Sequence, residues 1–103
     1  MIKMPRQTVH ANVARAANQC YSGGTRVSHF YVRESVTGQA SSTVEVVQDG
    51  LAIRIVIAVD IKETPVGTNV TYFVHPRFAI FTTFKPVITG WANGTGTHCG
   101  AIT

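Results

Sequence analysis

The chain of 103 residues carries little charge and few cysteines. Charged residues make up 14 % of it and apolar residues 45 %, a balance that excludes disorder driven by charge and low hydrophobicity. The longest apolar run, 51–59, is interrupted by Arg54 and falls far short of the roughly 18 to 20 residues of a membrane-spanning helix. We therefore expect one packed domain over residues 1–103, with flexible ends at 1–7 and 100–103.

Sequence motifs of catalysis and cofactor binding are also missing. The chain contains no GxSxG, no GxGxxG and no Walker sequence, and its four histidines lack HxxxH or HExxH spacing. The five acidic residues form no obvious pair of catalytic carboxylates, since most of them have expected positions in turns or across strands. The sequence therefore predicts a protein that is not an enzyme, without catalytic, cofactor-binding or metal-binding residues.

The net charge of +4 comes from nine basic residues that are dispersed along the chain. A nucleic-acid groove needs cations gathered on one face among stacking aromatic side chains, and no such cluster is present. A soluble basic surface is the favoured interpretation, and a cytosolic nucleic-acid-binding domain is kept as an alternative.

The two cysteines, Cys20 and Cys99, lie near opposite ends of the chain and have no zinc-site spacing. An even pair so placed predicts one disulfide, which is typical of periplasmic or secreted proteins. The first 20 residues contain Lys3 and Arg6 and no apolar segment of a signal peptide. The chain is therefore expected to be the mature form of an exported protein, with a cytoplasmic protein holding two free thiols as the alternative.

Two predicted hairpins define a three-stranded meander. Equal offsets around Asp49-Gly50 and around Pro65-Val66 place apolar residues opposite one another. The pairs are Val46 with Ile53, Val44 with Ile55, Ile61 with Val70, Val59 with Tyr72, and Ile57 with Val74. Because side chains alternate along a strand, this face is apolar, and the other face carries Glu45, Arg54, Asp60 and Lys62. We expect Ile55, Ile57, Val59 and Tyr72 to be buried.

Helical periodicity appears at both ends of the chain. An apolar stripe predicts a helix over Thr8–Cys20, and a strand is expected over Arg26–Arg33, followed by a loop over 34–42. The spacing of Phe81, Phe84, Ile88 and Trp91 predicts a second helix, in which Pro86 either causes a kink or begins a second turn. Residues 78–84 also fit a further strand. The tail over 93–103 is expected to be a loop.

These elements predict an α+β fold. It consists of a four-stranded antiparallel meander with the N-terminal and C-terminal helices packed on one face, because only the two helical stripes can cover the apolar side of the sheet. That arrangement brings the end of the first helix near the C-terminal tail, as a bridge between Cys20 and Cys99 requires.

The face of the sheet away from the helices holds the predicted functional site. Its registers gather Val56, Phe73 and His75, with Arg54 at the rim, into an apolar patch with charged neighbours. We expect a binding or interaction module that contacts a protein partner or a second copy. The alternative is a small-molecule or lipid carrier with an apolar pocket between sheet and C-terminal helix, near Tyr72, Ile57 and Trp91.

The order of elements also carries a resemblance. The order is a short helix ending in Cys20, a run of strands ending in Val70-Thr71-Tyr72-Phe73, a helix with Trp91, and a late Cys99. In this order the chain resembles small exported proteins and lipoproteins of proteobacteria. The resemblance implies an exported protein, and it assigns a role to no residue. The chain departs from the lipoprotein pattern because Ala17-Asn18-Gln19 before Cys20 is not a lipobox.

Overall fold

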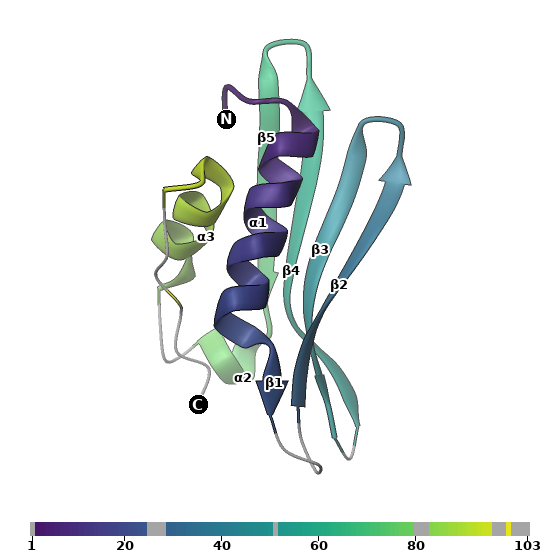
Figure 1. Ribbon diagram of the computed structural model, residues 1–103, viewed down its shortest axis with the longest axis vertical. Helices are drawn as coiled ribbons and strands as arrows, with labels where there is room; N and C mark the ends of the chain where they lie inside the picture. The colour runs from purple at the N-terminus through teal and green to yellow at the C-terminus, as the bar shows by residue number, and fades with distance from the viewer. Residues whose placement is uncertain (1, 25–28, 51, 80–82, 96–98, 100–103) are drawn as a thin grey trace.

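The computed structural model describes residues 2–24, 29–50, 52–79, 83–95 and 99 (Figure 1). Its elements follow one another as α1 (Arg6–Tyr21), β1 (Gly23–Gly24), β2 (His29–Gly38), β3 (Ser41–Asp49), β4 (Ile53–Thr64), β5 (Gly67–Val74), α2 (Pro76–Ala79) and α3 (Phe84–Asn93). The strands form one sheet in the order β1-β2-β3-β4-β5, and every neighbouring pair is antiparallel. The predicted α+β class, with a meander of four long strands and a helix at each end, is confirmed.

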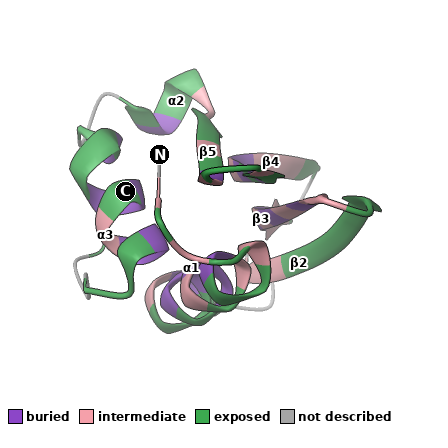
Figure 2. Cartoon of the chain, turned by 90° about the horizontal axis from the view of Figure 1, so that it is seen from above, coloured by how far each residue is buried: buried purple, intermediate pink, exposed green. Residues whose placement is uncertain are grey.

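The sheet has one covered face and one uncovered face. Helix α1 packs across β2, β3 and β4, and α3 packs mainly against α1, so both lie on the same side of the sheet (Figure 2). We call this side the inner face, and its buried strand residues are Val44, Val46, Ile57, Val59 and Ile61. On the opposite side, the outer face, no helix of the described part of the chain packs.

Proline sets the start of α1 and glycine its end. The helix begins two residues before the predicted Thr8, because Pro5 fixes the backbone ahead of the first turn and its carbonyl accepts the N–H groups of Thr8 and Val9 at 3.1 Å. After Tyr21 the chain leaves the helix. Gly23 has a φ of 109°, a backbone conformation that residues other than glycine rarely adopt. This reversal leads α1 directly into the edge strand β1.

The N-terminal segment was expected to be a flexible end, yet it pairs with the sheet. Ile2 and Thr68 exchange two backbone hydrogen bonds of 2.8 Å, and the Thr68 hydroxyl donates to the Met4 carbonyl at 2.6 Å. Thr68 is buried by this contact. The segment therefore covers one end of the edge strand β5.

The predicted register is correct for one hairpin and wrong for the other. Between β4 and β5, Ile61 lies opposite Val70, Val59 opposite Tyr72 and Ile57 opposite Val74, as expected. Between β3 and β4, however, Asp49 lies opposite Ile53, so the turn holds three residues rather than two. A β-bulge then places Val56 as an extra residue between the pairs Val47–Ile55 and Val46–Ile57.

The bulge explains which core predictions fail. It restores the predicted faces for Ile57 and Val59, which are buried as expected. Before the bulge, the inward and outward positions of β4 are the reverse of those predicted. Ile53 is therefore 68 % exposed, and Ile55 is only half-buried, opposite Val47. The prediction that Ile55 belongs to the inner core is therefore wrong.

Tyr72 is a second correction to the predicted core. It lies on the inner side of β5 but is 41 % exposed, because β5 is the edge of the sheet and α3 packs mainly on α1 rather than over β5. Strand β2 also runs further than predicted: residues 34–38 are strand and not loop, and Thr37 is an extra residue in its register. This part of β2 pairs with β3 but lies beyond the short strand β1, and its mostly polar sequence resembles a loop.

The region predicted as helix or strand is helical where it is described. Phe78 belongs to α2 and Phe84, Ile88 and Trp91 to α3, while residues 80–82 lie outside the described part. Pro86 falls in the first turn of α3, where its missing N–H has no intrahelical partner to lose. The tail turns back at Gly94, which has a φ of 72°.

The predicted disulfide is confirmed. Cys20, in the last turn of α1, is bonded to Cys99 with a Cα–Cα distance of 5.5 Å. The Asn12 side chain donates to the Ala92 carbonyl at 3.2 Å and so adds a polar contact between α1 and the end of α3. Among the described helices, none has the length and apolar character that crossing a membrane requires.

Candidate binding face

Three rows of side chains cross the outer face, each formed by residues directly opposite one another on β3, β4 and β5. From the β4–β5 turn toward α2, the rows are Ser41, Lys62 and Asn69; Thr43, Asp60 and Thr71; and Glu45, Ala58 and Phe73. The first two rows are wholly polar, and the third ends in an aromatic ring that is 50 % exposed. The outer face therefore joins a polar half to an exposed aromatic side chain.

The polar half is hollowed. A hollow of about 350 Å³ lies over the polar rows, and we call it the polar hollow. The outer-face residues that line it are Thr37, Ser41, Asp60, Lys62, Asn69 and Thr71. They come from four strands, and Thr37 is the extra residue of the register irregularity near the end of β2.

An ion pair borders the aromatic row. Arg33 Nε donates to Glu45 Oε1 at 2.8 Å across β2 and β3. The hydrogen bond to the Glu45 carboxylate, together with its negative charge, raises the pKa of Arg33 above its ordinary value. Glu45 was expected to face Arg54, but the shifted register places Ala58 opposite Glu45 and Gln48 opposite Arg54.

The structure does not bring the predicted patch residues together. Val56 is fully buried in the bulge, so its prediction as a surface residue is wrong. His75 is half-buried, accepts the Arg77 N–H at 3.2 Å and stacks edge-on against Phe78. Arg54 is half-buried near the β3–β4 turn. Of the four predicted patch residues, Phe73 is therefore the one that is strongly exposed on the outer face.

The residues predicted to line a carrier pocket are also separated. Ile57 and Trp91 are both buried, and Trp91 packs against Tyr21 with a centroid distance of 5.8 Å, whereas Tyr72 is exposed. These three side chains therefore do not line one open pocket.

A partly buried series of hydrogen bonds joins α1 to the sheet, and sequence reasoning missed it. His10 Nδ1 lies 2.8 Å from Ser42 Oγ, and His10 Nε2 lies 2.7 Å from Glu34 Oε1. Glu34 as a carboxylate can only accept, so Nε2 carries a proton toward it. Serine, histidine and acid in series resemble a nucleophile with its base, but Ser42 is 1 % exposed and no substrate reaches its oxygen. These three hydrogen-bonded side chains therefore have a structural role.

We expect His10→Ala to lower the free energy of unfolding by about 1 to 3 kcal/mol, because it leaves the buried Ser42 hydroxyl without its partner. Glu34→Gln should cost less than about 1 kcal/mol, since Glu34 is exposed and the amide oxygen still accepts. Urea unfolding measures both changes. The double variant His10→Ala/Ser42→Ala should lose less stability than the sum of the losses of His10→Ala alone and Ser42→Ala alone. Equal losses for His10→Ala and Glu34→Gln would show that Ser42 does not depend on the imidazole.

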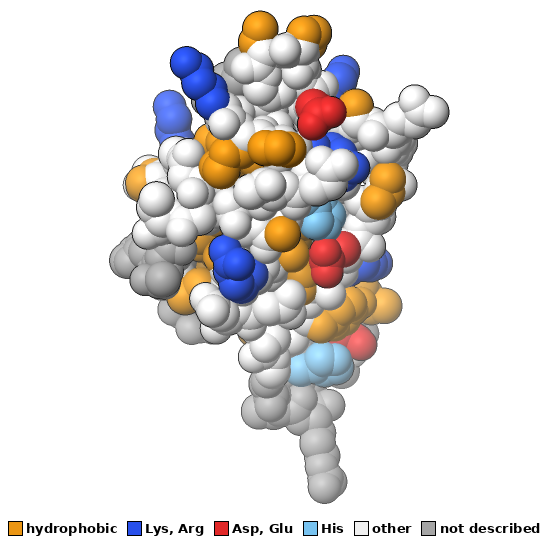
Figure 3. All heavy atoms as spheres, turned by 45° about the horizontal axis from the view of Figure 1, so that its top comes forward, with side chains coloured by type: hydrophobic (Ala, Val, Ile, Leu, Met, Phe, Trp, Pro, Cys, Tyr) orange, Lys and Arg blue, Asp and Glu red, His pale blue; other side chains and the backbone are white. Residues whose placement is uncertain are grey.

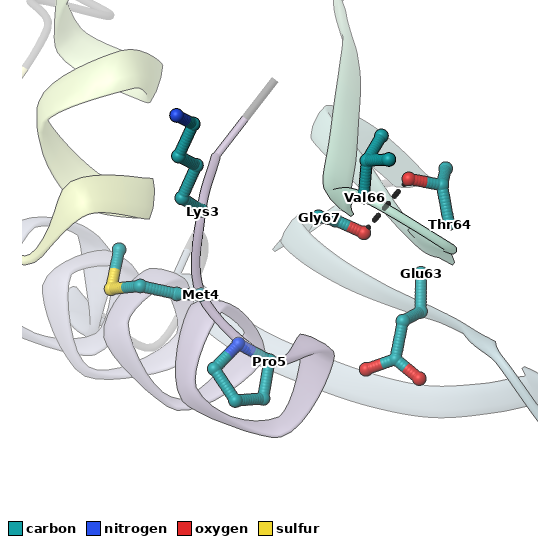
Figure 4. Close-up of a pocket in the computed structure, with 7 residues that line it drawn as sticks. All are labelled: Lys3, Met4, Pro5, Glu63, Thr64, Val66 and Gly67. Atoms are coloured by element: carbon teal, nitrogen blue, oxygen red, sulfur yellow. Dashed lines mark hydrogen bonds between the residues drawn. The ribbon is translucent and has the colours of Figure 1, made fainter.

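A second hollow, also of about 350 Å³, lies between the N-terminal segment and the β4–β5 turn. Figure 4 shows Met4 and Pro5 on one side of it and Glu63 and Val66 on the other. Glu63 Oε1 accepts the backbone N–H of Arg6 at 3.2 Å and so stabilises the first turn of α1. The Glu63 carboxylate therefore already connects the β4–β5 turn to the start of α1.

Charges elsewhere are dispersed. The Lys and Arg side chains visible in Figure 3 are interspersed with uncharged ones. Within the described residues, no group of three or more His, Cys, Asp or Glu could hold a metal ion.

Comparison of the chain with protein-family models, with curated proteins and with solved structures found no match. The resemblance to small exported proteobacterial proteins therefore stays a prediction.

Proposed function

We propose that this protein is a non-enzymatic binding module of the periplasm or the cell exterior, and that it contacts a protein partner through the outer face around Phe73. The observation that carries the proposal is the 50 % exposure of the Phe73 ring on the outer face of the edge strand β5, where no helix of the described residues packs. An antiparallel sheet normally exposes polar side chains on its uncovered face, so an exposed aromatic residue there favours recognition.

The surroundings of Phe73 support the same function. Ala58 lies opposite it, the Arg33–Glu45 ion pair borders its row, and polar residues follow on the other side. An apolar centre with a polar and charged rim is the usual composition of a protein interface, and a central aromatic side chain often supplies much of the binding energy.

The proposed location rests on the disulfide. Cys20 and Cys99 are bonded, and stable disulfides are typical of oxidising compartments and rare in the cytosol. An exported domain of this size gains stability from such a bond, because its core alone is small.

Phe73→Asp should abolish association while leaving the fold intact. The substitution places a charge at the centre of the proposed contact, but the side chain is exposed in the free protein, so unfolding by urea should change by less than about 1 kcal/mol. Association is measured by retention of a discrete partner from an envelope extract of the native host, and by sedimentation velocity for self-association.

The matched control is Val36→Asp, because Val36 is 73 % exposed on β2 and lies away from Phe73. The proposal expects the control to bind like the wild type. Equal retention by both variants would reject the outer face as the binding surface, and so would a Phe73→Asp protein that does not fold, since Phe73 would then belong to the core.

A further inference from the structure

We propose that the polar hollow beside Phe73 binds a neutral saccharide ring. The inference shares Phe73 and the outer face with the proposed function, but its polar contacts come from side chains that protein association through Phe73 does not need. It begins from the hydrogen-bonding groups that the two polar rows place over about 350 Å³. That volume lies at the lower end of the range of small-molecule sites, about 300 to 1,000 Å³.

The hollow offers donors and acceptors side by side. Asp60 lies directly opposite Thr71, and Lys62 directly opposite Asn69, so a carboxylate, a hydroxyl, an ammonium and an amide occupy the corners of one small area. Directly opposed residues on antiparallel strands have Cβ atoms about 4.5 to 5.5 Å apart. Neighbouring hydroxyls of a sugar each donate and accept, and they need this mixture of partners.

These groups remain available to a ligand. Within the described residues, the side chains of Lys62, Asn69 and Thr71 make no hydrogen bond or ion pair. Asp60 is held from one side only, because its Oδ1 accepts the Thr43 hydroxyl at 2.9 Å. That bond fixes one oxygen of the carboxylate and leaves the second oxygen without a hydrogen bond from the described residues.

Phe73 supplies the apolar part of the site. It lies two residues beyond Thr71 on the same face of β5, which is about 7 Å along the strand. A pyranose ring has a face of C–H groups as well as its hydroxyls, and a half-exposed aromatic ring can bury that face. The polar rows and Phe73 together therefore match both surfaces of a sugar.

The charges of the side chains that line the hollow favour a neutral ligand. The hollow contains one carboxylate and one ammonium, Asp60 and Lys62, which balance each other. An anionic or cationic ligand would gain from one of them and be opposed by the other. A neutral ring that hydrogen-bonds to both meets no such opposition.

The test is a titration of isotope-labelled full-length protein with the methyl glycosides of glucose, galactose, mannose and N-acetylglucosamine, followed by amide chemical shifts. We expect at least one glycoside to give saturable shifts that centre on Asp60, Lys62, Asn69 and Thr71. Affinity should be weak, in the millimolar range, because an open polar site competes with water. Absence of saturation with all four glycosides, or saturable shifts centred elsewhere, would overturn the proposal.

Variants separate this inference from the proposed protein contact. Asn69→Ala and Asp60→Ala should each weaken glycoside binding by about tenfold or more and leave protein association through Phe73 unchanged. Asn93→Ala, an exposed amide on α3, is the matched control and should bind like the wild type. Phe73→Trp should keep saccharide binding, whereas Phe73→Asp should remove it.

A zwitterion is the competing occupant, because Asp60 and Lys62 carry opposite charges. Glycylglycine serves as its probe in the same titration. Saturable shifts with glycylglycine and none with the glycosides would reject the saccharide, and unchanged glycoside binding in both Asn69→Ala and Asp60→Ala would reject the hollow as its site.

Discussion

Replacing Cys20 and Cys99 together by serine is expected to lower the free energy of unfolding by about 4 kcal/mol. The bond joins residues separated by 79 positions, so it closes a loop over most of the chain. In the chain-entropy model, a loop of about 80 residues restricts the unfolded state by about 4 to 4.5 kcal/mol, from which native-state strain is subtracted. Domains of this size have a total stability of about 5 to 15 kcal/mol, so the loss should be large.

Urea unfolding of the oxidised wild type, the reduced wild type and the double serine variant measures this effect. The two forms without the bond should unfold at the same lower urea concentration, and added reductant should not affect the variant. Intact mass before and after reduction should differ by the mass of two hydrogen atoms in the wild type alone. A loss below about 1 kcal/mol, or two free thiols in protein isolated under oxidising conditions, would contradict the prediction.

Ile57→Ala is expected to cost about 2 to 5 kcal/mol, because Ile57 is 0 % exposed between the sheet and its helices. The change removes three buried carbon groups and leaves a cavity in a core that can close only partly around it. The same substitution at Ile53, on the same strand, should cost less than about 1 kcal/mol, because that side chain is 68 % exposed.

The two isoleucines form a matched pair, since residue type, strand and substitution are the same and only burial differs. Urea unfolding at one pH compares them, and Tyr72→Ala adds a third case of an inner-side residue that is exposed. A greater loss for Ile53→Ala than for Ile57→Ala would mean that the bulge is misplaced and that the faces of β4 are reversed beyond it.

Local patterns in the sequence determined several parts of this protein. The β4–β5 register follows from a short turn and from apolar residues that alternate on both strands, so a shift by one residue would expose every one of them. Helix α1 follows from an apolar stripe between Pro5 and Gly23, and the disulfide from two cysteines that the covered sheet brings to the same place. Such features depend on neighbours along the chain or on the need to cover one apolar face.

Only the tertiary structure decided the remaining features. The bulge at Val56 adds one residue to β4, and alternation alone cannot reveal it, because Val46, Val47, Val56 and Ile57 are all apolar and all buried. Tyr72 is exposed because α3 packs on α1 instead of over the edge strand, a choice between two apolar surfaces that periodicity does not distinguish. The contacts of His10 with Ser42 and Glu34 join residues 32 and 24 positions apart, and the polar hollow collects side chains from four strands. Their proximity depends on how strands and helices pack in space, which local sequence patterns do not encode.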